Sequence, residues 1–166
     1  MIRTMLAVAV ALGVTGCPGS KEGPTITHKP TSVDLGQSVS SVVSADILAR
    51  EPVANRATVK HILISWAELA DAFGGRIDPR AAKRSRAEAE AEVRALLKQL
   101  ADGADFDALM KASSEDQGSA AGAREYNVTP DAQLVIEFRQ LSLRLQPGEV
   151  GVCQSDFGFH IIKRFS

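Results

Sequence analysis

Among the side chains of this chain whose types could do chemistry are two histidines, one aspartate and one serine. His61 and His160 each stand inside an apolar, strand-like stretch, and Asp116 and Ser155 lie in the interval between them. Serine, histidine and aspartate together could form a hydrolase triad, and histidines could bind zinc. However, the sequence lacks the Gly-x-Ser-x-Gly turn of one hydrolase class, and its three histidines lack the spacing of metal ligands. The residues alone otherwise favour core histidines with satisfied hydrogen bonds.

The expected elements that position these residues form an α+β domain with a small sheet. β-branched and apolar stretches predict strands, and apolar residues at helical spacing predict helices. Ser85 and Glu88 match a capping box, and Gly103 is expected to end the helix that they open. In order, we expect a strand at 58–65, a helix from Ser85 to Gly103, a short helix capped by Asp105, a helix opened by Thr129 and Pro130, and a hairpin of strands at 149–154 and 157–165.

The first residues indicate export rather than folded structure. Arg3 precedes an apolar run at 5–14, which is shorter than the ~20 residues that span a bilayer and fits a signal peptide at 1–16. The stretch Val-Thr-Gly-Cys that ends at Cys17 resembles the lipobox of bacterial lipoproteins. That resemblance implies lipidation of Cys17 and a domain anchored to a membrane of the bacterial cell envelope, facing the periplasm or exterior. An ordinary signal peptide is the alternative.

The length and composition of residues 17–166 predict one domain that follows a flexible tether. Residues 17–55 are expected to form a flexible tether rich in Ser, Thr, Gly and Pro, and residues 56–166 the domain. With 19 Lys and Arg against 20 Asp and Glu, the formal net charge is −1, which argues against a nucleic-acid partner. If Cys17 is lipidated, Cys153 is the remaining thiol, and its apolar neighbours predict a buried structural residue. The balanced charge is compatible with a monomer.

Five segments between about residues 57 and 166 resemble the parvulin-type peptidyl-prolyl isomerases. They are Lys-His-Ile-Leu-Ile at 60–64, Asp-Phe-Asp-Ala-Leu at 105–109 with Ser-Ser-Glu-Asp at 113–116, the apolar helix at 134–138, Leu-Gln-Pro-Gly-Glu-Val at 145–150, and Ser-Asp-Phe-Gly-Phe-His-Ile-Ile-Lys at 155–163. Each is weak alone, and together they are specific. The resemblance implies a four-stranded, mostly antiparallel sheet surrounded by about four helices.

The same resemblance implies an enzyme that rotates X–Pro peptide bonds in proline-containing segments of exported proteins and needs no metal or cofactor. His61 and His160 match the paired histidines of adjacent central strands, Asp116 matches a position held by Asp or Cys, and Ser155 matches a hydroxyl beside the histidines. Leu134 and Phe138 match the proline pocket, to which we expect Phe157 to add. We expect the histidines and Ser155 to form a hydrogen-bonded network rather than to transfer protons.

Two features keep alternatives open. The family's glycine-rich stretch is replaced by residues 121–127, where the expected pocket leucine falls on Arg124 or Glu125. A catalytically weak parvulin-fold chaperone or peptide-binding module is therefore an alternative function, and a purely structural envelope protein is a third. The loop at 74–86 is rich in arginine and lysine, which we interpret as a solvated start of the following helix, with a mild preference for acidic clients left open.

Overall fold

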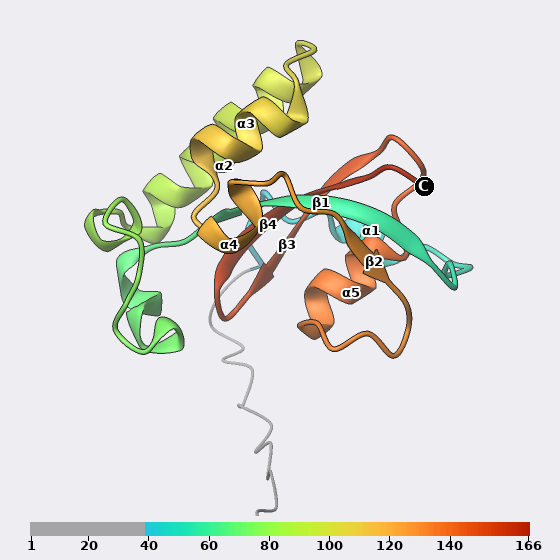
Figure 1. Ribbon diagram of the computed structural model, residues 1–166, viewed down its shortest axis with the longest axis horizontal. Helices are drawn as coiled ribbons and strands as arrows, with labels where there is room; N and C mark the ends of the chain where they lie inside the picture. The colour runs from blue at the N-terminus through green and yellow to red at the C-terminus, as the bar shows by residue number, and fades with distance from the viewer. Residues whose placement is uncertain (1–38) are drawn as a thin grey trace, which may run out of the picture. The chain divides into compact units, whose positions relative to one another are not determined.

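The computed structural model describes residues 39–166, which belong to a compact unit of 38–166 (Figure 1). The predicted signal peptide at 1–16, the predicted lipidation site Cys17, and His28 lie outside the described residues. Within 39–166, no helix is both long and apolar enough to cross a membrane.

A four-stranded antiparallel sheet forms the centre of this unit, as expected. Its strands are β1 (Ala57–Ile64), β2 (Tyr126–Val128), β3 (Val150–Ser155) and β4 (Gly158–Arg164), in the spatial order β2-β1-β4-β3 (Figure 1). The central strands β1 and β4 pair with Leu63 opposite His160 and Ile162 opposite His61. The two histidines therefore lie on adjacent central strands as diagonal neighbours, because His160 is two residues from Ile162, the residue opposite His61.

Helices surround the sheet, and local sequence explains several of their ends. Ser85 and Glu88 form the predicted capping box of α2, and the Asp105 carboxylate caps α3 by accepting from the Ala108 amide at 2.8 Å. Gly103, at φ +95°, follows the end of α2, as predicted. The helices are α1 (Ala45–Leu48), α2 (Arg86–Ala101), α3 (Phe106–Ser113), α4 (Gln117–Ala120) and α5 (Ile136–Ser142), with 3-10 turns η1 (Ala67–Phe73) and η2 (Ala81–Lys83).

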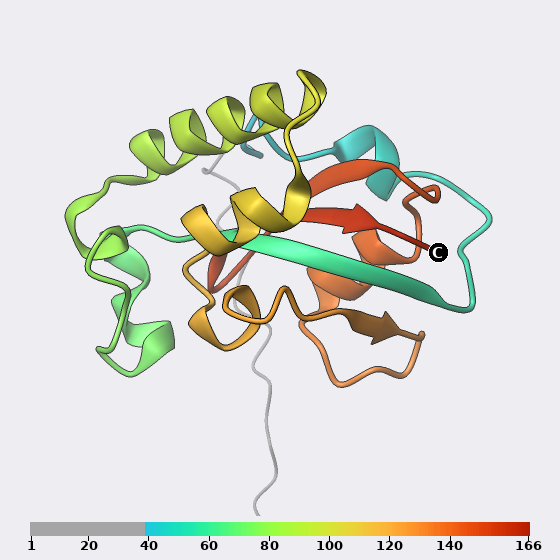
Figure 2. The same cartoon turned by 45° about the horizontal axis from the view of Figure 1, so that its top comes forward.

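Alternation along the central strands separates two cores and places the histidines. Ile62 and Ile64 of β1 and Phe159 and Ile161 of β4 belong to one core cluster with residues of α2 and α3. These two helices lie on one face of the sheet (Figure 2). The opposite face packs against α5 and α1. Because successive strand side chains point to opposite faces, His61 and His160 share the α5 face. This face carries the candidate site.

Two sequence-based boundaries need correction. The folded part starts before the expected residue 56, because Val42 and Ile47 are buried and the Ser44 amide donates to the Val152 carbonyl at 2.9 Å. The helix predicted to open at Thr129 and Pro130 instead begins at Ile136. Here the Thr129 hydroxyl donates to the Asp131 carboxylate at 2.6 Å, and such local side-chain bonds favour turns over helix.

Candidate active site

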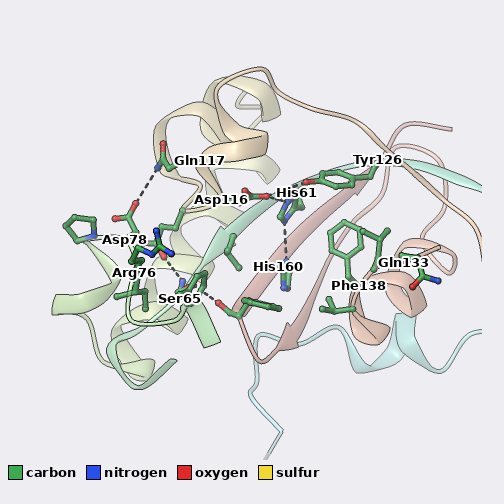
Figure 3. Close-up of a pocket in the computed structure, with 18 residues that line it drawn as sticks. His61, Ser65, Arg76, Asp78, Asp116, Gln117, Tyr126, Gln133, Phe138 and His160 are labelled. Atoms are coloured by element: carbon green, nitrogen blue, oxygen red, sulfur yellow. Dashed lines mark hydrogen bonds and ion pairs between the residues drawn. The ribbon is translucent and has the colours of Figure 1, made fainter. Parts of the chain in front are cut away.

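Ser155, His160, His61 and Asp116 form one continuous chain of hydrogen-bonding contacts. Figure 3 shows its His160, His61 and Asp116 members. The Ser155 hydroxyl lies 2.7 Å from His160 Nε2, the two histidine Nδ1 atoms lie 3.3 Å apart, and His61 Nε2 lies 3.1 Å from Asp116 Oδ2. Both histidines are 5% exposed. The chain links the β3–β4 hairpin, both central strands and the loop before α4.

The Asp116 carboxylate can only accept hydrogen bonds, and this determines which group donates at each contact of the chain. Asp116 accepts from His61 Nε2, and this bond, with a further one from Ser119, holds the pKa of Asp116 well below its usual range. A single ring proton of His61 on Nε2 leaves its Nδ1 to accept from His160 Nδ1, and His160 Nε2 then accepts from Ser155. The Phe157 amide completes the series by donating to Ser155 Oγ at 3.1 Å.

Two residues that the sequence analysis missed also hold the Asp116 carboxylate. The buried Ser119 hydroxyl donates to Oδ2 at 2.7 Å, and the Tyr126 hydroxyl donates to the same oxygen at 3.4 Å. Burial and the Asp116 charge raise the pKa of Tyr126, so its phenol remains a donor. The spacing Asp-x-x-Ser was a usable signal, since Asp116 caps α4 and Ser119 lies on its first turn. Tyr126 offered no local signal, because it reaches Asp116 from β2.

His160 is poorly suited to carry a proton. Burial and, second to it, the neighbouring His61 lower the pKa of His160 to about 3. Neither does the arrangement form a hydrolase triad, because His160 separates Ser155 from His61, and His61 rather than His160 contacts Asp116. The residues 39–166 contain no cluster of His, Cys, Asp or Glu able to hold a metal ion. The contacts predicted among the two histidines and Ser155 are present, and the absence of proton transfer stays a prediction.

An apolar cavity of about 870 Å³ opens beside the network (Figure 3). Phe138 lies edge-on to His61, with ring centroids 5.2 Å apart, and Tyr126 lies edge-on at 5.4 Å. Leu134 lines the same wall from the turn before α5. The lining residues are His61, Leu63, Ser65, Phe73, Arg76, Ile77, Asp78, Pro79, Glu115, Asp116, Gln117, Tyr126, Gln133, Leu134, Val135, Phe138, Phe157 and His160.

The structure brings six of the seven sequence-predicted site residues to this cavity. The six are His61, Asp116, Leu134, Phe138, Phe157 and His160. Ser155 stands behind His160 and does not line the cavity. Arg124 and Glu125, where a pocket leucine was expected, do not line it either; Tyr126 does, and the Arg124 guanidinium lies over the Tyr126 ring at 5.1 Å.

A buried ion pair braces the loop that carries Asp116. The neighbouring Glu115 accepts from Arg84 at 2.6 Å and from the Ser65 amide at 2.6 Å, and the Glu115 side chain is 1% exposed. Arg84 also pairs with Glu92 at 2.6 Å. The interpretation of the 74–86 arginines as a solvated helix start is therefore wrong for Arg84, whose side chain is 11% exposed and pairs with both carboxylates.

Residues 45–165 match the family model described as the PPIC-type PPIASE domain. The chain belongs to this family. The match of the PPIC-type domain includes α1 and begins before the boundary expected from the sequence.

Individual relatives of this PPIC-type domain are similar over the same region. The chaperone SurA of Pseudomonas aeruginosa is 34% identical over 106 residues, which are 63% of this chain and 22% of that protein. The chaperone SurA of Ralstonia nicotianae is 36% identical over 107 residues, covering 63% and 19%. The match thus spans about a fifth of these relatives. Peptidyl-prolyl isomerase ESS1 from Candida albicans has a TM-score of 0.57 at 19% identity, over 68% of this chain and 63% of that one, which shows a shared fold.

Proposed function

We propose that this chain is a peptidyl-prolyl cis-trans isomerase that acts on proline-containing segments of exported polypeptides at the bacterial cell envelope. One observation carries the proposal: an ionised carboxylate, Asp116, stands on the wall of an apolar cavity beside a buried histidine pair. Family membership supports the same activity. Leu134, Phe138 and Tyr126 offer an apolar surface of the kind that a proline ring would bury.

The chemistry requires only that the amide lose its resonance. An X–Pro bond rotates over a barrier of about 18–20 kcal/mol, because resonance gives the C–N bond partial double-bond character. Resonance also places negative charge on the carbonyl oxygen. A negative carboxylate near that oxygen disfavours the charge and so favours the twisted, single-bond form. Asp116 accelerates rotation in this way if it repels the planar amide more than the twisted one.

The remaining polar groups act as positioning residues. His61, Ser119 and Tyr126 hold the Asp116 carboxylate in one orientation and keep it ionised. His160 and Ser155 hold His61 in the tautomer that donates to Asp116. This mechanism includes no proton transfer and needs no nucleophile.

Exchange between the cis and trans forms of a short X–Pro peptide, followed by two-dimensional NMR with the purified full-length chain, tests the proposal. We expect acceleration that falls in the Asp116→Ala and Leu134→Ala variants. No acceleration at high protein concentration would reject the activity.

A binding module with little catalysis is the second candidate function, because the relatives are named chaperones. Such a module would bind peptides equally well with or without proline. Titration with matched Pro and Ala peptides separates the two functions.

The place of action is a separate part of the proposal. The apolar run at 5–14 and the lipobox-like stretch ending at Cys17 support export and lipid anchoring. Two or more acyl chains hold a protein stably at a membrane, whereas one does so marginally. Mass spectrometry of the N-terminal peptide after expression in a bacterium tests this part. We expect a lipid mass on Cys17 that the Cys17→Ser variant lacks, and an unmodified thiol would refute anchoring.

A further inference from the structure

Residues 40–54, which we name the edge strap, precede β1 in the chain and pack against β3. β3 is last in the strand order β2-β1-β4-β3, so it pairs with a strand of the sheet on one side only. Ser44 occupies the other side, because its amide donates to the Val152 carbonyl at 2.9 Å and its hydroxyl accepts from the Val152 amide at 3.0 Å. The edge strap thus covers the backbone groups that an edge strand leaves unpaired.

The edge strap reaches both faces of the sheet from this edge. Val42, before Ser44, is 7% exposed and belongs to the core on the α2 face. Ile47, after Ser44, is 5% exposed and belongs to the core on the α5 face. The edge strap is therefore anchored in both cores, and Ile47 is the anchor that shares a core with α5.

Ile47 packs with α5 over a glycine of β3. A β-carbon placed on Gly151 would lie 3.2 Å from both Ile47 Cδ1 and Leu141 Cδ1, the latter on α5. Leu145 Cδ2 would lie 3.1 Å from the same point. The three methyl groups therefore converge on the space that the glycine leaves open. Because protein interiors are close-packed, a change in one of these side chains is transmitted to the others.

Hydrogen bonds also join the edge strap to the C-terminal end of α5. The Ala54 amide donates at 2.9 Å to the carbonyl of Leu143, the residue that caps this end. The last carbonyls of a helix lack partners within the helix, so this bond satisfies one of them. Just beyond the helix, Arg144 donates to the Arg50 carbonyl and to the Glu51 carboxylate, each at 3.2 Å. The edge strap thus holds α5 both at its apolar side and at its end.

The same side of α5 carries a wall of the cavity. Phe138 lines the cavity and lies edge-on to His61 and His160, with ring centroids 5.2 and 5.6 Å apart (Figure 3). Residues three positions apart are neighbours on a helix surface, so Phe138 and Leu141 lie on one side of α5. The position of α5 over β3 therefore determines where the Phe138 ring stands relative to the histidine pair.

We propose that Ile47 is a positioning residue for substrate binding, which acts through α5 on the cavity wall at Phe138. Without the Ile47 side chain, α5 relaxes toward the vacated space and carries the Phe138 ring with it. The three side chains that donate to the Asp116 carboxylate lie outside α5. Loss of Ile47 should therefore weaken binding of the proline and leave the carboxylate in place. That Phe138 contacts a proline rests on the proposed isomerase function.

The test compares Ile47→Ala with Leu96→Ala in the full-length chain, after circular dichroism has shown that both are folded. Leu96 is 3% exposed in the opposite core, so each change removes three carbon atoms from a buried side chain. NMR titration with a short Ala-Pro peptide measures affinity, and cis-trans exchange at several peptide concentrations measures KM and kcat. We expect Ile47→Ala to weaken affinity and raise KM about tenfold, with kcat changed by less than about twofold. Leu96→Ala should change neither.

The ring-proton shifts of the two active-site histidines supply a readout that needs no substrate. These shifts depend on the neighbouring Phe138 ring, so they should move in Ile47→Ala and stay in place in Leu96→Ala. Ile47→Val removes one carbon atom and should give a smaller change in the same direction. If Ile47→Ala does not fold, Ile47→Val decides the question by the same measurements.

Unchanged affinity and unchanged histidine shifts in the Ile47 variants would overturn the positioning role. An equal loss of affinity in Leu96→Ala would also overturn it, because the effect would then follow from lower stability in general. The two proposals fail separately. Absence of accelerated exchange in the unmodified chain rejects the isomerase function alone, since the histidine shifts still decide the role of Ile47. Accelerated exchange in the unmodified chain, with normal affinity and shifts in Ile47→Ala, rejects the positioning role alone.

Discussion

His61 and His160 face each other through their Nδ1 atoms, 3.3 Å apart, from diagonal positions on the central strands. In this geometry one Nδ1 must donate and the other must accept, so two doubly protonated rings would set two N–H groups against each other. The pair thus connects the β3–β4 hairpin to the Asp116 loop only while it is not fully protonated. This relationship makes the site sensitive to acid.

Stability should fall as the pH drops below neutral. Burial, together with the neighbouring His61, lowers the pKa of His160 to about 3, below the value near 6.5 of an unfolded histidine. Between these values the unfolded state binds the extra proton and the folded state does not, so acid favours unfolding. The contribution is fully present above about pH 6.5 and is lost as the pH falls toward 3. Urea unfolding should show a loss of about 2 kcal/mol between pH 7 and pH 5.

A His160→Gln variant is the control, because it cannot take up a proton in this range. Its free energy of unfolding should be lower at pH 7 but should change less between pH 7 and pH 5. An equal pH dependence in both proteins would show that His160 does not cause the loss.

Removal of the Asp116 charge should slow isomerisation whether or not the side chain keeps its size. Asp116→Ala and Asp116→Asn should each reduce kcat/KM by about 100-fold, in the range found when one electrostatic group of an active site is deleted. Asn is nearly isosteric with Asp, so near-normal activity in Asp116→Asn would show that shape rather than charge matters. Cis-trans exchange by NMR measures the effect, and circular dichroism checks that both variants are folded.

The sequence was sufficient to predict the elements whose signals are local. The capping box at Ser85, the cap at Asp105, the β3–β4 hairpin and the histidine strands depend on short patterns, and the structure confirms them. The family resemblance supplied the pairing of His61 with His160, which lie 99 residues apart. Local patterns contain no information on such a distant contact.

The features that prediction missed depend on tertiary contacts. Tyr126 reaches the site because β2 pairs with β1, and the alternation of that pairing turns its ring toward His61. Arg84 was interpreted as part of a solvated helix start, yet it pairs with the buried Glu115, which lies 31 residues away. The helix predicted from Thr129 failed for a local reason, the Thr129–Asp131 hydrogen bond, which competes with helical geometry.

Loss of the hydroxyl groups that donate to Asp116 should weaken catalysis by changing the carboxylate rather than by unfolding the protein. Ser119→Ala removes a 2.7 Å donor, and Tyr126→Phe removes a 3.4 Å donor while keeping the ring against His61 and Phe138. Because these bonds lower the pKa of Asp116 or fix its orientation, we expect Ser119→Ala to have the larger effect on kcat. The carboxyl carbon of Asp116, observed by NMR during an acid titration, should titrate at higher pH in Ser119→Ala than in the unmodified chain. An unchanged titration would contradict this role.

Truncation of the apolar wall should raise KM more than it lowers kcat. Leu134→Ala removes apolar surface from the wall next to Phe138, at a cost of about tenfold in kcat/KM. Leu134 is only half-buried, in a turn before α5, so the fold should tolerate the change. Leu134→Met keeps similar volume and should retain most of the activity. If Leu134→Ala has normal KM, the proline does not bind at this wall.

The ion pair between Glu115 and Arg84, next to Asp116, should affect both stability and catalysis. Glu115 is buried with Arg84, and its backbone amide also donates to the Leu63 carbonyl at 2.9 Å. Glu115→Ala removes one of the two carboxylates that pair with Arg84, so that Glu92 remains, and it leaves the Ser65 amide without its acceptor, so we expect a loss of about 1–3 kcal/mol in urea unfolding. Arg84→Met combined with Glu115→Ala removes both charges and should cost less than the sum of the single changes.

Because Asp116 follows Glu115 directly, kcat should also fall in Glu115→Ala under conditions where the variant is folded. Additive stability losses, or full activity in the folded variant, would show that the ion pair does not position the carboxylate.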